Sequence, residues 1–185
     1  MKEIYFARQP IYTRNLEIEG YELFYRNAET DTTAQFLDAE IATSQIVLNT
    51  VTEVGLDRIV GKHKAFINVA RDFILDGHLE GFAMPQLVFE IVADIMVDEP
   101  LLQALRRLRK QGCHFVLDDY VDNEAYQALL EIADYVKIDM LTTPEKEVRR
   151  LASRLRQCKV TLMAERIETL SIQELCQTLR FDYLQ

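Results

Sequence analysis

The sequence lacks any long apolar run. No hydrophobic segment approaches the roughly 18 residues that a transmembrane helix needs. The N-terminal stretch MKEIYFARQP also lacks the charged region, the long apolar stretch and the cleavage site of a secretory signal peptide. These absences argue against membrane and secreted classes, and we expect a cytoplasmic protein with no membrane contact.

Cysteine and histidine are both scarce. The residues are Cys113, Cys158, Cys176, His63, His78 and His114. No two cysteines have CxxC spacing and the histidines show no paired spacing, so neither type forms a zinc or redox motif. We expect free thiols that are buried or half-buried, and histidines that belong to the surface or the core.

Positive charge is in deficit. Twenty-one Lys and Arg against 30 Asp and Glu give a formal net charge of −9, which opposes non-specific attraction to a phosphate backbone. DNA is therefore not an expected partner. Low-complexity tracts are also absent, and 185 residues with 49% hydrophobic content can bury one sizeable core, which predicts a single domain over residues 1–185.

Short apolar segments alternate with longer segments of helical period. The strand candidates after the first are 18–26, 64–70, 86–92, 113–120, 135–139, 160–166 and 181–185. Continuous apolar runs are typical of strands buried on both faces, and their alternation with helices predicts βαβ crossovers. The first strand precedes TRN (13–15), which leaves no room for a helix before the next strand. The pattern therefore predicts an α/β fold, a (β/α)₈ TIM-like barrel with an antiparallel N-terminal hairpin. No GxGxxG motif favours a Rossmann fold instead.

Five segments have the period of an amphipathic helix. They are 36–54, 98–112, 124–133, 145–157 and 171–179. The clearest is 98–112, in which Leu101, Leu105 and Leu108 lie on one stripe, Pro100 suits the first turn and Gly112 suits the end. The chain stops at Gln185, so we expect the last helix of the barrel to be missing from it. Either the chain is cut from a longer protein, which we favour, or another chain covers that flank.

Polar residues stand late in, or just after, nearly every predicted strand. They are Glu22, Asn68, Glu90, Asp118, Asp119, Lys137, Glu165 and Gln185. In a (β/α)₈ barrel the carboxyl ends of the strands form the active-site rim, so these side chains should converge. Hard oxygen donors suit Mg²⁺, Mn²⁺ or Ca²⁺, and Lys137 among them could hold a water or a phosphate oxygen. The constellation predicts hydrolysis of a phosphodiester. Taken singly, a strand-end carboxylate is more often a cap, an interpretation that applies most to Asp119 and Asp139.

These motifs together resemble a known family. In chain order they are YELFYR, FINVA, LVFEIV, FVLDDY, DYVKIDM, LMAERIET and FDYLQ. The order is similar to that of the EAL domain, the cyclic di-GMP phosphodiesterase barrel, and the resemblance covers nearly the whole chain.

The resemblance implies a role for each matching position. It implies metal ligation for Glu22, Asn68, Glu90 and Asp118, with Asp119 at a second metal. It places Lys137 beside the attacking water and Glu165 near the metals as a base. It implies that Gln185 closes the site and that Arg26 meets the phosphate or guanine of the ligand.

The sequence also departs from the family pattern. The Phe-Gly-Thr-Gly loop expected after the paired aspartates is YVDN (120–123). The glutamate expected three residues after Glu90, which anchors that loop in the family, is Ala93. The signature reads Glu-Leu-Phe, and the glycine after Glu165 is Arg166, whose side chain should project towards the ligand end or fold out to solvent. These changes and the ARQPIY opening resemble the EAL portion of EAL-HDOD signalling proteins, although no HDOD domain is present.

The resemblance implies a degenerate domain in bacterial cyclic di-GMP signalling. We expect a binding, regulatory or protein-interaction module with weak or no hydrolysis, and weak Mg²⁺ or Mn²⁺ binding with an impaired second site. The alternative is a Mg²⁺- or Mn²⁺-dependent phosphodiesterase that yields the linear dinucleotide. The expected partners are cyclic di-GMP, another signalling protein or an HDOD domain. The sequence does not decide whether the chain forms a dimer.

Overall fold

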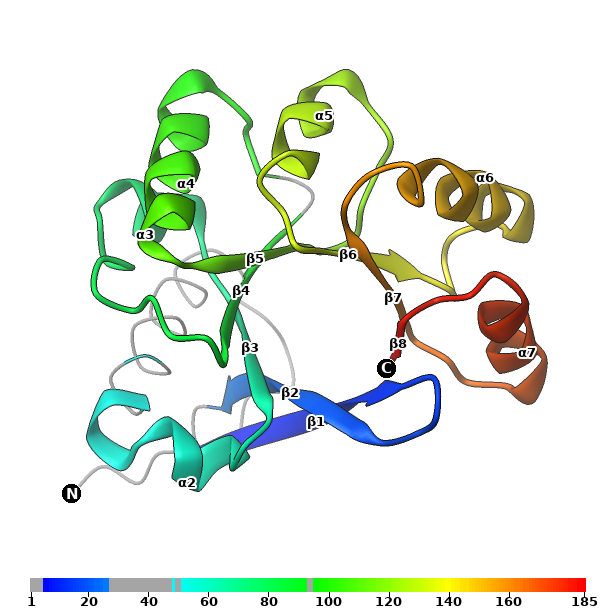
Figure 1. Ribbon diagram of the computed structural model, residues 1–185, viewed down its shortest axis with the longest axis horizontal. Helices are drawn as coiled ribbons and strands as arrows, with labels where there is room; N and C mark the ends of the chain where they lie inside the picture. The colour runs from blue at the N-terminus through cyan, green and yellow to red at the C-terminus, as the bar shows by residue number, and fades with distance from the viewer. Residues whose placement is uncertain (1–4, 27–47, 49–50, 93–94) are drawn as a thin grey trace.

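The computed structural model describes residues 5–26, 48, 51–92 and 95–185, and in these ranges eight strands form one closed barrel (Figure 1). The strands are β1 Tyr5–Thr13, β2 Ile18–Arg26, β3 Lys64–Asn68, β4 Leu87–Ile91, β5 His114–Leu117, β6 Tyr135–Asp139, β7 Thr161–Glu165 and β8 Tyr183–Leu184. Each strand pairs with its neighbours in chain order, and β2 to β8 run parallel. The predicted (β/α)₈ barrel is confirmed.

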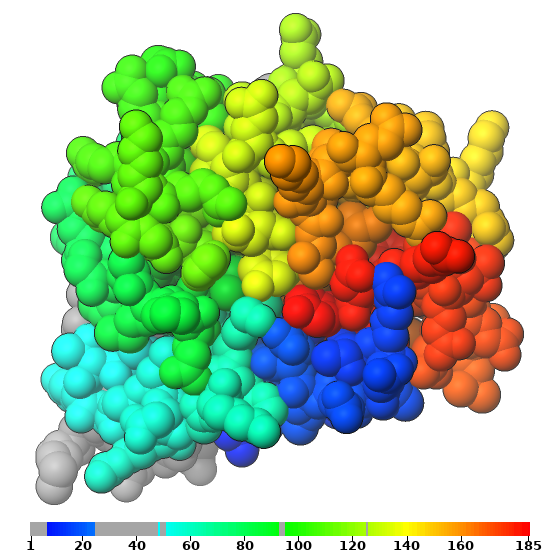
Figure 2. All heavy atoms as spheres, in the orientation of Figure 1, coloured from blue at the N-terminus to red at the C-terminus, as the bar shows by residue number. Residues whose placement is uncertain are grey.

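The N-terminal hairpin closes the ring. Strand β1 pairs antiparallel with β2 along most of its length and antiparallel with β8 at its far end, where Tyr12 faces Leu184. Arg14, in the hairpin turn, donates to the carbonyl of Phe181 and pairs with Asp182 at 2.6 Å. Figure 2 shows the hairpin beside the C-terminal segment on one face of the molecule. The hairpin thus takes the place that a parallel strand has in a regular barrel.

The helices lie outside the ring of strands (Figure 1). They are α2 Leu56–Val60, α3 Arg71–Leu75, α4 Glu99–Gln111, α5 Glu124–Leu130, α6 Glu145–Leu155 and α7 Leu170–Thr178. Helix α4 lies within the predicted segment 98–112, because Asp98 caps its first turn and Gly112, predicted as its end, adopts the left-handed conformation (φ 101°) that suits glycine. The predicted helix 36–54 lies largely outside the described residues. No helix in the described ranges is both long and apolar enough to cross a membrane.

An apolar layer fills the middle of the barrel. Its buried members are Ile11, Phe66, Val88, Val116, Tyr135 and Met163, with Tyr183 packed against them. Strand β2 contributes Gly20 at this level, where a Cβ would stand 2.9 Å from both the Lys64 carbonyl oxygen and the Phe66 ring. A glycine is therefore required here because the neighbouring strand and an interior ring occupy the space.

Alternation along the strands links this layer to the polar residues. Successive side chains of a strand point to opposite faces, so a residue two positions further on also points into the barrel, one layer nearer the carboxyl end. The seven pairs are Gly20 and Glu22, Phe66 and Asn68, Val88 and Glu90, Val116 and Asp118, Tyr135 and Lys137, Met163 and Glu165, and Tyr183 and Gln185. The layer of polar side chains therefore packs directly against the apolar layer in the barrel interior.

Candidate active site at the carboxyl end of the barrel

The centre of the polar layer is the ammonium group of Lys137. Its Nζ donates to Glu22 Oε2 at 2.9 Å and to Glu90 Oε2 at 2.8 Å. It also lies 3.6 Å from Asp118 Oδ1 and 4.0 Å from Glu165 Oε2. Five strands thus bring one cation and four carboxylates together, and Lys137 is the only buried cation among the described residues.

Two amides join the cluster through Glu22. Asn68 donates from Nδ2 to Glu22 Oε1 at 3.1 Å, and Gln185 donates from Nε2 to Glu22 Oε2 at 2.7 Å. The residues that the sequence predicted on β2 to β8 therefore converge on one rim, as expected. The side chains of Arg26 and Ala93 lie outside the described residues, so their predicted contributions stay predictions.

The cluster is short of positive charge. Burial would lower the pKa of Lys137, but the carboxylates of Glu90, Asp118 and Glu22 outweigh burial and hold that pKa well above its ordinary value. Burial raises the pKa of Glu90 well above its ordinary value. Burial and the nearby Asp118 carboxylate raise the pKa of Glu165 to about 8. These raised pKa values show that one ammonium does not suffice for all four carboxyl groups to ionise in a buried space, and a further cation would favour their ionised forms.

The inner donor set fits a hard divalent cation. Within the described part of the chain, Glu90 Oε1, Asp118 Oδ1 and Gln185 Oε1 are buried oxygens that receive no hydrogen bond. Buried oxygens without partners are costly in a protein interior unless they bind a cation or water. Carboxylate and amide oxygens are the ligands that Mg²⁺, Mn²⁺ and Ca²⁺ prefer.

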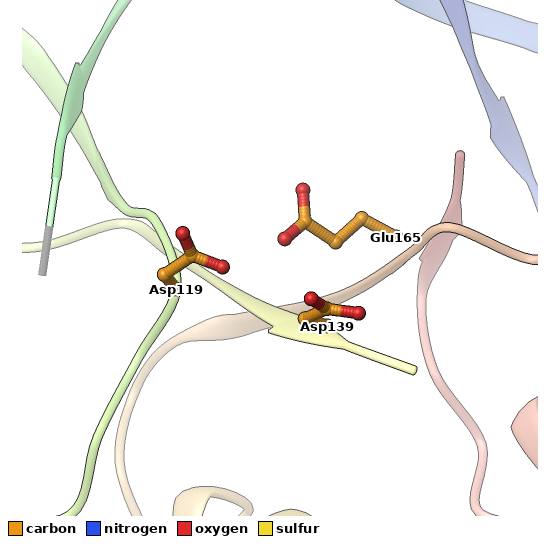
Figure 3. Close-up of side chains that lie close together, drawn as sticks. All are labelled: Asp119, Asp139 and Glu165. Carbon is orange, nitrogen blue, oxygen red and sulfur yellow. The ribbon is translucent and has the colours of Figure 1, made fainter. Parts of the chain in front are cut away.

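A second acidic group lies nearer the solvent. Asp119, Asp139 and Glu165 follow or end β5, β6 and β7, and Figure 3 shows their carboxylates pointing towards one another. One oxygen from each lies within 4.8 Å of the others. The sequence predicted Asp139 only as a cap, and its position beside Asp119 and Glu165 is a finding of the structure.

Asp139 is nevertheless a cap as well, as the sequence predicted. Its Oδ1 accepts from the backbone of Leu141 at 2.7 Å and of Thr142 at 3.1 Å. Its Oδ2 accepts from the Thr142 hydroxyl at 2.5 Å and from Arg166 Nη1 at 3.1 Å. Both oxygens are therefore engaged, and Asp139 is less available to a cation than its two neighbours.

The loop that carries Asp119 is anchored, which the sequence interpretation missed. The family resemblance implies an anchor only at position 93, where this chain has Ala93. In the structure Asp122, from the loop itself, pairs with Arg150 at 2.7 Å and with Arg154, both on α6. The signal available in the sequence was two arginines spaced four apart, which face the same side of a helix.

The cysteines and histidines stay outside the site. Cys113 and Cys176 are buried, Cys158 is half-buried, and all three are free thiols, as predicted. His63 and His114 are half-buried and His78 is exposed.

Two curated bacterial proteins are similar to the chain in sequence. The uncharacterized protein YuxH of Bacillus subtilis is 29% identical over 171 residues, which cover 90% of this chain and 42% of that protein. The cyclic di-GMP phosphodiesterase CdgJ of Vibrio cholerae is 28% identical over 171 residues, which cover 91% of this chain and 40% of that protein. The chain thus spans about two fifths of the length of these relatives. No family model matches it.

Solved EAL structures share the barrel. The PaMucR phosphodiesterase in its c-di-GMP complex superposes with a TM-score of 0.74 at 19% identity, over 98% of this chain and 88% of that one. The Bacillus subtilis YkuI protein, with an EAL domain, in complex with c-di-GMP and calcium, superposes with a TM-score of 0.73 at 18% identity, over 98% of this chain and 53% of that one. The chain therefore shares the barrel fold of these structures.

One departure of the sequence from the EAL pattern has a clear structural counterpart. Arg166 has a φ of 58°, in the left-handed region that favours glycine, and it occupies the position where the family resemblance implies a glycine. Its guanidinium contacts Asp139 at the rim, although the side chain is half-exposed. The side chain thus combines the two expected positions, because it reaches the carboxyl rim of the barrel and is also open to solvent. The kinship with EAL-HDOD proteins stays a prediction.

Proposed function

We propose that this chain is a cyclic di-GMP-binding domain of bacterial signalling that takes up the dinucleotide together with one divalent cation and hydrolyses it slowly or not at all. The observation that supports it best is the inner cluster, in which Glu22, Asn68, Glu90 and Asp118 surround Lys137 on one rim. A buried, oxygen-rich site with excess negative charge destabilises a barrel unless it binds a cation, so such a site points to a function.

Mg²⁺ or Mn²⁺ is the cation that we propose, held by Glu22, Asn68, Glu90 and Asp118. When bound, such an ion polarises a phosphoryl oxygen and lowers the pKa of a coordinated water. Lys137 then supplies a fixed positive charge beside these carboxylates, where it can orient a water or a phosphate oxygen by donating a hydrogen bond.

The rim offers further contacts to the ligand. Gln185 donates to Glu22 and leaves its buried Oε1 without a partner among the described residues, so it can accept a hydrogen bond from a bound molecule. Arg166 is half-exposed at the same rim and carries the charge that a phosphate needs. Among the described side chains, we therefore assign the direct phosphate contacts to Lys137 and Arg166, and Arg26 stays a further contact that the family resemblance implies.

Slow turnover follows from the outer acidic group. Residues 120–123 contain no glycine, and Asp139 is occupied by Arg166 and by its cap hydrogen bonds. A misplacement of reacting groups by about 1 Å can cost roughly 10²-fold in rate. We expect turnover at least about 10²-fold below an EAL enzyme with an intact loop, by the same positioning argument. Replacing residues 120–123 by Phe-Gly-Thr-Gly together with Ala93→Glu should restore part of the rate.

The deciding experiment incubates the protein with cyclic di-GMP and Mn²⁺ and measures binding by calorimetry and the linear dinucleotide by chromatography. We expect binding without appreciable product. Asp118→Asn should weaken Mn²⁺ binding by at least about tenfold because it removes a charged ligand. Asp72→Asn, which changes an exposed carboxylate on α3, is the matched control and should bind Mn²⁺ like the parent protein. Two equally tight Mn²⁺ sites, or no nucleotide binding, would contradict the proposal.

The enzyme alternative has one observation in its favour. Asp119, Asp139 and Glu165 already bring oxygens within 4.8 Å of one another, which is a reasonable starting point for a second cation. Product formation at the rate of an intact EAL enzyme would establish this phosphodiesterase function in place of the regulatory one.

A further inference from the structure

The carboxylate of Asp122 is buried although its loop lies at the surface. Its side chain is only 5% exposed, and Arg150 Nη1 lies 2.7 Å from its Oδ2. Arg154 Nη1 bonds to the other oxygen, Oδ1. Because Arg150 and Arg154 are one helical turn apart on α6, they enclose the carboxylate from the same side. We call this arrangement the Asp122–α6 clamp.

The clamp differs from an ordinary surface ion pair. Arg150 is itself oriented by Glu147, which accepts from it at 2.7 Å, and Tyr120 directs its hydroxyl to Asp122 at 3.4 Å. Burial would raise the pKa of Asp122, but the hydrogen bonds from Arg150 and Arg154 outweigh it and lower the pKa. The carboxylate is thus held as an anion by two arginines, with a geometry that isolated exposed pairs rarely keep.

The segment between the clamp and the site is short and held along its length. Tyr120 is buried, packs edge-on against Tyr126, and donates its backbone N–H to the carbonyl of Lys137 at 3.3 Å. Asn123 caps α5 by accepting from the Tyr126 backbone at 3.1 Å. Only residues 120 and 121 separate Asp119 from Asp122, so a shift of the clamped carboxylate is transmitted to Asp119.

Asp119 itself needs such support. Its φ is 48°, in the left-handed region that a non-glycine residue adopts only at a cost. Strained backbone of this kind persists when the surrounding structure fixes it, and it occurs often at functional sites. Residues 120–123 contain no glycine that could form the turn on its own. The residues that support Asp119 in this chain are therefore its neighbours Tyr120 and Asp122.

We propose that Asp122, Arg150 and Arg154 are positioning residues that set the place of Asp119 beside Glu165. The second, weaker metal site that the family resemblance implies at Asp119 then depends on this clamp. The inference rests on the proposed function for the identity of the ion, whereas the order of the loop can be measured without any ion. In this proposal the Asp122–α6 clamp anchors the loop in place of the glutamate that the family resemblance implies at position 93.

The first test is hydrogen exchange of the Tyr120 amide, followed by NMR without metal. Asp122→Asn, and separately Arg150→Gln with Arg154→Gln, should speed this exchange at least tenfold and leave the Ile138 amide in β6 unchanged. The matched control is Arg149→Gln on the same helix, which breaks only the exposed pair with Glu145 and should leave Tyr120 unchanged. Unaltered exchange in the clamp variants would overturn the proposal.

The second test counts bound Mn²⁺ by calorimetry and electron paramagnetic resonance, without nucleotide. Asp122→Asn should weaken the second Mn²⁺ at least tenfold and change the first by less than twofold. Arg150→Lys with Arg154→Lys keeps both charges and should recover part of the loss; it also serves if Asp122→Asn does not fold. Equal weakening of both ions, or no second ion in the parent protein, would refute the clamp. Clamp-dependent Mn²⁺ binding without nucleotide binding would instead refute the proposed function alone.

Discussion

Removing the central ammonium group should destabilise the barrel severely. In Lys137→Met the side chain keeps much of its length, but Glu22 and Glu90, 5% and 0% exposed, lose their cation. Breaking a buried ion pair costs about 3–5 kcal/mol. Burial would raise the pKa of Glu22, but Lys137 holds that pKa low. Without Lys137 the Glu22 carboxylate can protonate instead, which at pH 7 costs about 3.7 kcal/mol for an ordinary pKa of about 4.3, at 1.36 kcal/mol per pH unit. Both routes give a similar loss in the free energy of unfolding.

Thermal unfolding followed by circular dichroism in EDTA measures this loss. A domain of 150–250 residues loses about 2–4 °C in Tm for each kcal/mol, so about 3–5 kcal/mol corresponds to a drop of about 6–20 °C. The control Lys146→Met changes an exposed lysine on α6 and should stay within about 0.5 kcal/mol of the parent protein. Adding Glu90→Gln to Lys137→Met should raise Tm again, because it removes a carboxylate that has lost its partner. A Tm unchanged by Lys137→Met, or lowered further by Glu90→Gln, would refute the reasoning.

Three further outcomes follow from individual contacts. Gly20→Ala should lower the free energy of unfolding in urea by about 1–3 kcal/mol, because the new methyl would meet neighbours at 2.9 Å. A thiol reagent should label half-buried Cys158 first and buried Cys176 last, since burial raises the pKa of Cys176 to about 11. Burial would raise the pKa of Asp134, but the hydrogen bond from Arg109 keeps it low. The stability from Asp134 is therefore present above about pH 4 and lost on acidification, so the Tm deficit of Asp134→Asn at pH 7 should shrink at pH 3.

Periodicity predicted the barrel well because parallel strands and amphipathic helices repeat their signals. The segments 18–26 and 135–139 coincide with β2 and β6, and α4 differs by one residue at each end. The two short helices α2 and α3, five residues each, were not predicted, because five residues complete too little of a helical period to show a stripe. Segment 113–120 was predicted three residues too long at its end, since β5 ends at Leu117 and Asp119 turns into the left-handed region.

The inner site could be predicted because each polar residue occupies the same position on its own strand. Contacts between loops and helices carry no such regularity. The pairing of Asp122 with Arg150 and Arg154 joins residues about thirty positions apart, and the rotation of α6 that brings them together is set by the packing of its apolar face. The engagement of Asp139 by Arg166 likewise depends on backbone dihedrals that the sequence pattern does not reveal.

The hairpin that completes the ring also sets an order for folding during synthesis. Tyr12 pairs with Leu184 and Thr13 pairs with Tyr183. This edge of β1 therefore stays unpaired during synthesis until nearly the whole barrel sequence has left the ribosome. Contacts between such distant positions form slowly, and an unpaired edge strand can meanwhile join other chains. A growing chain should therefore be most prone to aggregate, and most in need of a chaperone, in the interval before β8 emerges.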